Sequence, residues 1–281
     1  MREHICNIFS KLLTSVNAFF RWDTFFSVWD SLFSKREPRK KVSGLTWLLL
    51  LGIVVYFVVV QLCLRHDEPG VRRDSVAILA QVAKWHQTGE YITEGRLGTF
   101  VPPFAPYVFR LPLLLGLPLE QGILRLLLLF GMSVPVLSFL IARECGSDDK
   151  TALVLAALIA SNPYLHDLYN SILRDPVFIP IALLALYLIM RYYNRPGILT
   201  VCGVGVVSAL ALLTRYEGIL LPALFATVCS LTAYRDHAWK RSAAWMLIFL
   251  GSWAVCVGLL LYSWNVFSVA LKVFFWRFST L

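Results

Sequence analysis

Long apolar runs separated by short polar segments are the feature that most restricts what this sequence can fold into. Of the 281 residues, 58% are hydrophobic and only 15% are charged, and the mean hydropathy is +0.68. Soluble domains contain roughly 45 to 50% apolar and about 25% charged residues. The runs approach the roughly 17 to 25 apolar residues that a helix needs to cross a bilayer. A soluble domain is therefore excluded.

We expect six of these runs to span the membrane, and a shorter seventh between the first and the last. The six are residues 45–64, 122–142, 176–190, 198–213, 219–234 and 243–264. The shorter span begins at Ala152 and stops near Asn162. Because lipid offers no hydrogen-bond partner to the peptide group, each span must be helical. The expected fold class is all-α, a polytopic membrane protein.

The formal charge of +9 raises the question of a nucleic-acid partner. The basic residues flank the apolar runs, however, and the densest cluster lies just before the first span. That cluster is Lys35, Arg36, Arg39, Lys40 and Lys41. Basic residues beside a span stay on the cytoplasmic side. We therefore expect a cytoplasmic N-terminus and a membrane partner, with no nucleic acid.

Three regions follow from this pattern: residues 1–44, a transmembrane core at 45–264, and an aromatic and basic tail at 265–281. In the first region, apolar residues at three- and four-residue spacing over residues 5–33 predict an amphipathic helix. It lies either in the cytoplasmic interface or against the protein itself. No cleavable signal peptide is recognisable there. The six cysteines are scattered singly without metal-ligand spacing, which disfavours a disulfide framework or a zinc site.

The longest polar segment is the first outer loop, residues 65–104. Within it, residues 75–88 have helical periodicity, which predicts a helix lying on the outer membrane surface. Residues 107–117 form an apolar piece that carries Arg110 and is flanked or interrupted by prolines, and we interpret it as a half-inserted helix. With spans alternating from the first, every loop placed inside carries Lys or Arg, as the positive-inside rule requires.

Acids and arginines gather on the outer side of this topology. They are Asp67, Glu68, Arg73, Asp74, Arg174, Asp175, Arg215 and Glu217. Ionisable groups at the ends of apolar helices usually face the protein interior, a cavity or the headgroups. Arginine forks can hold a lipid-linked phosphate while a carboxylate takes a proton from an incoming hydroxyl. The alternative is that these side chains extend to headgroups or pair to fix the topology.

Short motifs around these residues occur in a fixed order. Residues 73–75 read Arg-Asp-Ser, residues 89–91 read Gly-Glu-Tyr, and residues 102–104 read Pro-Pro-Phe. Further on come Asn-Pro-Tyr at 162–164, Arg-Asp-Pro at 174–176 and Leu-Thr-Arg-Tyr-Glu-Gly at 213–218. With its motifs in this order, the chain resembles the GT-C membrane glycosyltransferases. Within that class it is most similar to the branch that contains aminoarabinose transferases, protein O-mannosyltransferases and rhizobial lipopolysaccharide glycosyltransferases. The resemblance covers roughly residues 45–235.

The resemblance implies a GT-C-like helical bundle whose periplasmic first loop carries a surface helix, in the inner membrane. It implies a polyprenyl phosphate sugar donor, a lipid or glycan acceptor, and transfer on the extracytoplasmic face. Asp74 would be the general base, with Asp67 and Glu68 as rivals for that role. Arg174 and Arg215 would contact the donor phosphate and Arg73 would also bind substrate, while Asp175 and Glu217 would orient the arginines or the acceptor.

Two questions stay open at this point. Some relatives use a divalent metal ion and others do not. The outer acids Asp67, Glu68 and Asp74 could hold such an ion, but acids alone do not define a metal site, so the sequence predicts no certain cofactor and no certain metal ligand. Family members are usually considerably longer than this chain, which leaves a compact member, a truncated product or a fragment as alternatives. A non-catalytic membrane protein, such as a scaffold or transporter component, is therefore the competing function.

Overall fold

The computed structural model describes residues 42–64, 73–89 and 102–263, without the side chains of Arg73, Asp74, Arg235, Asp236 and Ser263. All of these residues belong to one compact unit, Val42–Leu281. The expected helix at residues 5–33, the basic cluster before the first span, and the tail at 265–281 lie outside the described residues. So do the acids Asp67 and Glu68.

The described residues are helical throughout, apart from short turns. The helices are α3 (Gly44–Leu64), α4 (Arg73–Thr88), α5 (Phe104–Leu114), α6 (Leu119–Glu144), α7 (Asp149–Ala160), α8 (Pro163–Tyr169), α9 (Asp175–Asn194), α10 (Ile198–Thr214), η1 (Tyr216–Ile219), α11 (Leu220–Asp236) and α12 (Trp239–Ser263). The described part contains no strand. The predicted all-α membrane class is thus confirmed.

Five helical segments are long and apolar enough to cross a membrane. They are Gly44–Leu64, Leu119–Glu144, Asp175–Asn194, Tyr216–Tyr234 and Trp239–Tyr262. The two other expected spans correspond to α7, with 12 residues, and α10, with 17 residues. Both are shorter than the roughly 20 residues of a typical spanning helix. The count of seven spans therefore stays a prediction.

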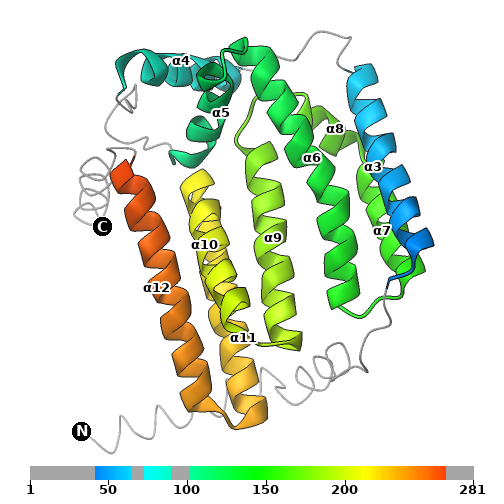
Figure 1. Ribbon diagram of the computed structural model, residues 1–281, viewed down its shortest axis with the longest axis vertical. Helices are drawn as coiled ribbons and strands as arrows, with labels where there is room; N and C mark the ends of the chain where they lie inside the picture. The colour runs from blue at the N-terminus through cyan, green and yellow to red at the C-terminus, as the bar shows by residue number, and fades with distance from the viewer. Residues whose placement is uncertain (1–41, 65–72, 90–101, 264–281) are drawn as a thin grey trace, which may run out of the picture. The chain divides into compact units, whose positions relative to one another are not determined.

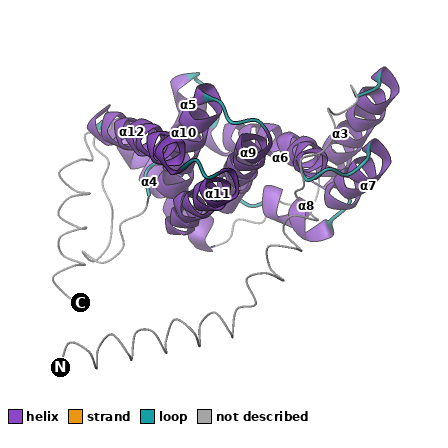
Figure 2. Cartoon of the chain, turned by 90° about the horizontal axis from the view of Figure 1, so that it is seen from below, coloured by secondary structure: helices purple, strands orange, loops and turns teal. Residues whose placement is uncertain are grey.

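The longer helices pack side by side. Helix α6 packs on α7 and α9, α9 packs on α10, and α10 packs on α12. Figure 2 shows α12, α10, α9 and α6 next to one another in a row, with α11 beside α9 and α10. The α6–α7, α9–α10 and α11–α12 connections lie at one end, and the α5–α6 and α10–α11 connections lie at the other (Figure 1). This alternation matches the relative sidedness expected from the sequence.

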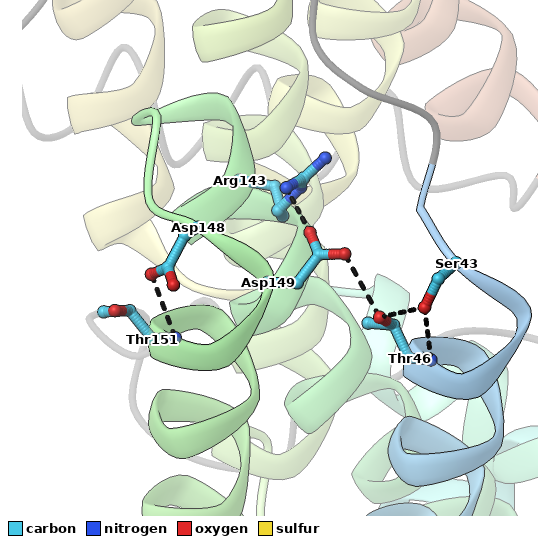
Figure 3. Close-up of polar contacts among 6 residues, drawn as sticks. All are labelled: Ser43, Thr46, Arg143, Asp148, Asp149 and Thr151. Atoms are coloured by element: carbon cyan, nitrogen blue, oxygen red, sulfur yellow. Dashed lines mark hydrogen bonds and ion pairs between the residues drawn. The ribbon is translucent and has the colours of Figure 1, made fainter.

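Polar contacts join α3, α6 and α7 at the end of the bundle where α6 and α7 connect (Figure 3). Arg143 at the end of α6 forms an ion pair with Asp149, and Thr46 Oγ1 on α3 donates to Asp149 Oδ2 at 3.1 Å. Asp148 caps α7 by accepting from the Thr151 N–H at 3.2 Å, and hydrogen bonding to the side chain and then to the backbone of Thr151 lowers the pKa of its carboxyl. Carboxylates favour a helix N-terminus, so this turn is locally determined by its two aspartates.

A buried histidine ties α8 to α3 and α7. His166 is 3% exposed and stacks on Phe57 of α3 at 4.9 Å between ring centroids. Its Nε2 lies 2.7 Å from the Ala160 carbonyl oxygen, so Nε2 must carry the proton and donate it. Nδ1 then accepts from Gln61 Nε2 at 3.0 Å, while the same amide also donates to the His166 carbonyl at 3.1 Å. A neutral imidazole therefore satisfies this network.

We expect the fold to lose stability as the pH falls below the ordinary histidine value of 6.5, because burial lowers the pKa of His166. The unfolded chain takes up a proton in that range and the folded protein resists it, so protonation favours unfolding. The measurement is the thermal unfolding midpoint in detergent from pH 7.5 to 5, for the wild type and His166→Gln. The variant should lose part of the pH slope, and equal slopes would contradict the assignment.

Candidate functional site

The candidate site begins where α10 ends and the chain turns back into α11. Thr214 is fully buried and its Oγ1 donates to the Leu210 carbonyl at 2.7 Å. Arg215 then adopts an extended backbone with φ −148° and ψ 146°, and its N–H donates to the Ala211 carbonyl at 2.9 Å. The helix thus ends sharply, and Arg215 and Glu217 come to lie at the end of the bundle that also holds α4 (Figure 1).

Arg215 joins two separate stretches of chain. Its Nε donates to Glu217 Oε2 at 3.2 Å and its Nη2 to Glu217 Oε1 at 2.8 Å, which is a two-pronged fork on one carboxylate. Its Nη1 forms an ion pair with Asp175 Oδ1 in the first turn of α9. The guanidinium also lies 5.9 Å from the ring centroid of Phe178. One arginine therefore fixes the positions of both carboxylates.

The cluster is open to solvent and close to charge balance. The side chains of Arg215, Asp175 and Glu217 are 30%, 34% and 55% exposed. Arg174, half-buried and next to Asp175 in sequence, lies within electrostatic range of the Glu217 carboxylate. Two acids and two arginines thus meet at one place. The structure brings together the predicted residues Arg174, Asp175, Arg215 and Glu217, while their roles toward a substrate stay predictions.

Gly218 explains why the motif around Arg215 ends in glycine. A Cβ at position 218 would lie 2.4 Å from the carbonyl carbon of Ala211 and 2.4 Å from the nitrogen of Leu212. These are backbone atoms of α10 and cannot move aside as a side-chain tip would. The 3-10 turn therefore packs directly on the end of α10, and this close packing sets the position of Glu217.

We expect Gly218→Ala to displace Glu217 and to weaken the fork on Arg215. The clash is with helix backbone, so the cost should be in the range of about 1 to 3 kcal/mol typical of overpacking. The matched control is Gly251→Ala in α12, where a Cβ meets nothing within 4 Å. The thermal unfolding midpoint in detergent should fall for Gly218→Ala and stay unchanged or rise for the control. Equal midpoints would contradict the close packing.

Helix α4 confirms the helical periodicity expected at residues 75–88 and lies across the end of the bundle (Figure 1), while its place on the outer membrane surface stays a prediction. Its buried residues Ile78, Val82 and Trp85 recur at helical spacing, and α4 packs on α5. Trp85 belongs to one apolar cluster with Leu213, two residues before Arg215. The first turn of α4 contains Asp74, whose side chain lies outside the described part. Whether Asp74 meets Arg215 therefore stays a prediction.

Two side chains near this cluster received no role from the sequence. Phe178 gave no signal, because an apolar residue in an apolar helix is indistinguishable from its neighbours. Arg110 did give a sequence signal, because it is the single charged residue of α5. The residues around it, however, matched no motif. Its place over the Trp85 ring, at 5.2 Å from the centroid, appears only in the structure.

The acids expected to hold a divalent ion, if one is bound, are Asp67, Glu68 and Asp74. None of these acids has a described side chain. Among the described residues, no group of three or more histidine, cysteine, aspartate or glutamate residues is placed to hold a metal.

One comparison with known proteins is informative. The family model of dolichyl-phosphate-mannose-protein mannosyltransferases matches residues 101–262, which is more than half of the chain and includes Asp175, Arg215 and Glu217. No curated protein and no solved structure matches this chain significantly. The matched family is a GT-C family, as the order of the motifs implied. The chain therefore belongs to the dolichyl-phosphate-mannose-protein mannosyltransferase family of GT-C membrane glycosyltransferases.

Proposed function

We propose that this protein transfers a sugar from a polyprenyl phosphate donor to a hydroxyl of a lipid or glycan acceptor on the extracytoplasmic face of the inner membrane. The observation that carries this proposal is the Asp175–Arg215–Glu217 cluster, which joins the start of α9 to the turn after α10. It lies within the residues matched by the family model. The family description implies a polyprenyl-phosphate-linked sugar as donor.

The reaction needs a base for the acceptor hydroxyl. In this proposal Asp74 takes the hydroxyl proton as the acceptor oxygen attacks the anomeric carbon from the face opposite the phosphate. The bond between the anomeric carbon and the phosphate oxygen breaks, and its electron pair leaves with polyprenyl phosphate. The configuration at the anomeric carbon is thereby inverted. A positioned base of this kind accelerates such a step by about 10²- to 10⁴-fold.

Negative charge increases on the departing phosphate during this step, so preorganised cations near it stabilise the transition state. Two carboxylates hold Arg215 in place, so its guanidinium does not have to reorient during the reaction. Arg174 stands beside the same acids. In this account Asp175 and Glu217 keep Arg215 in place at the mouth of the site, rather than taking the proton themselves.

The test is transfer by the purified protein. Wild-type protein in detergent or nanodiscs is incubated with polyprenyl phosphate carrying a radiolabelled sugar and with a bacterial envelope lipid and glycan extract. We expect label to move from the donor into the extract, together with free polyprenyl phosphate. Donor binding without transfer would instead favour a non-catalytic family member. If the protein neither binds the donor nor transfers the sugar, the proposal is wrong.

A further inference from the structure

Arg110 is a cation in an otherwise uncharged helix, and none of the ion pairs among the described residues involves it. It is the single charged residue of α5, and its guanidinium carbon lies over the Trp85 ring of α4 at 5.2 Å from the centroid. Its Nε is buried and has no hydrogen-bond partner among the described residues. A buried donor that makes no hydrogen bond costs free energy, because it has lost its contact with water. The ring face stabilises the positive charge but offers no acceptor for the N–H groups.

The position of Arg110 relates it to the cluster around Arg215. The Trp85 ring that holds Arg110 also packs with Tyr107, at 6.0 Å between ring centroids, and shares an apolar cluster with Leu213. Leu213 lies two residues before Arg215 on the last turn of α10. Arg110 thus sits where α4, α5 and the end of α10 meet, which is the end of the bundle that carries the charged cluster (Figure 1).

The Arg215 cluster carries no excess positive charge to attract a phosphate. Asp175 and Glu217 both contact Arg215, so these three side chains together carry one net negative charge. Arg174 brings the group only to neutrality. A phosphate approaching this cluster meets the two carboxylates as well as the arginines, and the carboxylates reduce the net Coulomb attraction. Arg110, which forms no ion pair with a described carboxylate, is a stronger binding group for the phosphate.

We propose that Arg110 binds the phosphate of the polyprenyl phosphate substrate. A phosphate oxygen would supply an acceptor for the Arg110 guanidinium, whose Nε has no hydrogen-bond partner among the described residues, and a guanidinium is the side chain best suited to a phosphate. Trp85 holds the guanidinium by one face and so leaves its edge for the phosphate. This inference rests on the proposed function, because it assumes a lipid-linked phosphate as substrate.

The test is binding of polyprenyl phosphate without a sugar, measured on full-length protein in nanodiscs by native mass spectrometry. Arg110→Gln should weaken binding about 10- to 100-fold, which is the range for losing a charge-assisted hydrogen bond. Arg110→Lys keeps the positive charge but not the forked guanidinium, so its affinity for polyprenyl phosphate should lie between those of the wild type and Arg110→Gln. The matched control is Arg125→Gln, an exposed arginine on α6, which should bind as the wild type does.

Two further probes identify what is recognised and exclude a merely structural effect. Polyprenol, which lacks the phosphate, should bind equally weakly to the wild type and Arg110→Gln, because Arg110 acts on the phosphate alone. Inorganic phosphate should compete with polyprenyl phosphate in the wild type and not in Arg110→Gln. A variant that loses polyprenol and polyprenyl phosphate binding to the same extent would overturn the inference, as the change would then lie in the fold.

Failure of this inference differs from failure of the proposed function. Suppose that the wild type binds polyprenyl phosphate better than polyprenol, and that Arg110→Gln shows the same preference. The role proposed for Arg110 is then wrong, while the proposed function stands. If the wild type does not prefer polyprenyl phosphate to polyprenol, both fail.

Discussion

Asp74→Asn should reduce the initial rate of sugar transfer by about 10²- to 10⁴-fold, the range that a general base contributes. Asparagine has nearly the shape of aspartate but cannot take the acceptor proton at neutral pH. It is also accepted in the first turn of a helix, where Asp74 lies. Expression and the unfolding midpoint should therefore stay close to those of the wild type. The rate is measured as labelled sugar transferred per minute at saturating donor.

The rivals for the base provide the controls for this prediction. Asp67→Asn and Glu68→Gln should retain most of the transfer rate, since neither acid would take the proton. If one of these variants is inactive and Asp74→Asn is active, the base has been assigned to the wrong acid. If all three variants transfer sugar at the wild-type rate, the proposed proton transfer is wrong.

Arg215→Gln should lower transfer by about 10²- to 10³-fold, the cost of removing one preorganised group that stabilises transition-state charge. It should also destabilise the fold, because Asp175 and Glu217 would face each other without the cation that both contact. The three side chains are about a third exposed or more, so solvent screening limits that loss to roughly 1 kcal/mol. The measurements are the transfer rate and the unfolding midpoint in detergent.

A second substitution separates the two effects of losing Arg215. In Arg215→Gln/Asp175→Asn the repulsion between the acids is removed, so the unfolding midpoint should return toward the wild-type value. Transfer should stay low, because the arginine is still missing. Recovery of transfer together with stability would show that Arg215 has only a structural role.

The sequence predicted the helices well, because a membrane leaves the backbone few choices. The runs at residues 45–64 and 122–142 appear as α3 and α6, and the periodicity at 75–88 appears as α4. Helix ends were less certain where a helix is short. The apolar run from Ala152 gives only the 12 residues of α7, since Asn162 caps the next helix, α8, by accepting from Tyr164 N at 2.9 Å.

The site was predictable in part. The Arg-Asp and Arg-Tyr-Glu-Gly motifs indicated that Asp175, Arg215 and Glu217 would share one face, and the structure joins them. Contacts between distant segments were beyond the sequence. Neither the stacking of Arg110 on Trp85 nor the packing of Gly218 against Ala211 follows from local spacing, because both depend on how separate helices dock.

The central claim is that Asp74 and the Arg215 cluster belong to one site, and a distance measurement tests it most directly. Spin labels are placed in a cysteine-free background at positions 74 and 217, and the distance is measured by pulsed electron paramagnetic resonance in nanodiscs. The 175/217 pair is the short reference, because both residues contact Arg215. The 194/217 pair is the long reference, since Asn194 ends the helix that Asp175 begins. We predict a 74/217 distribution close to the short reference, and one that coincides with the long reference would contradict the account.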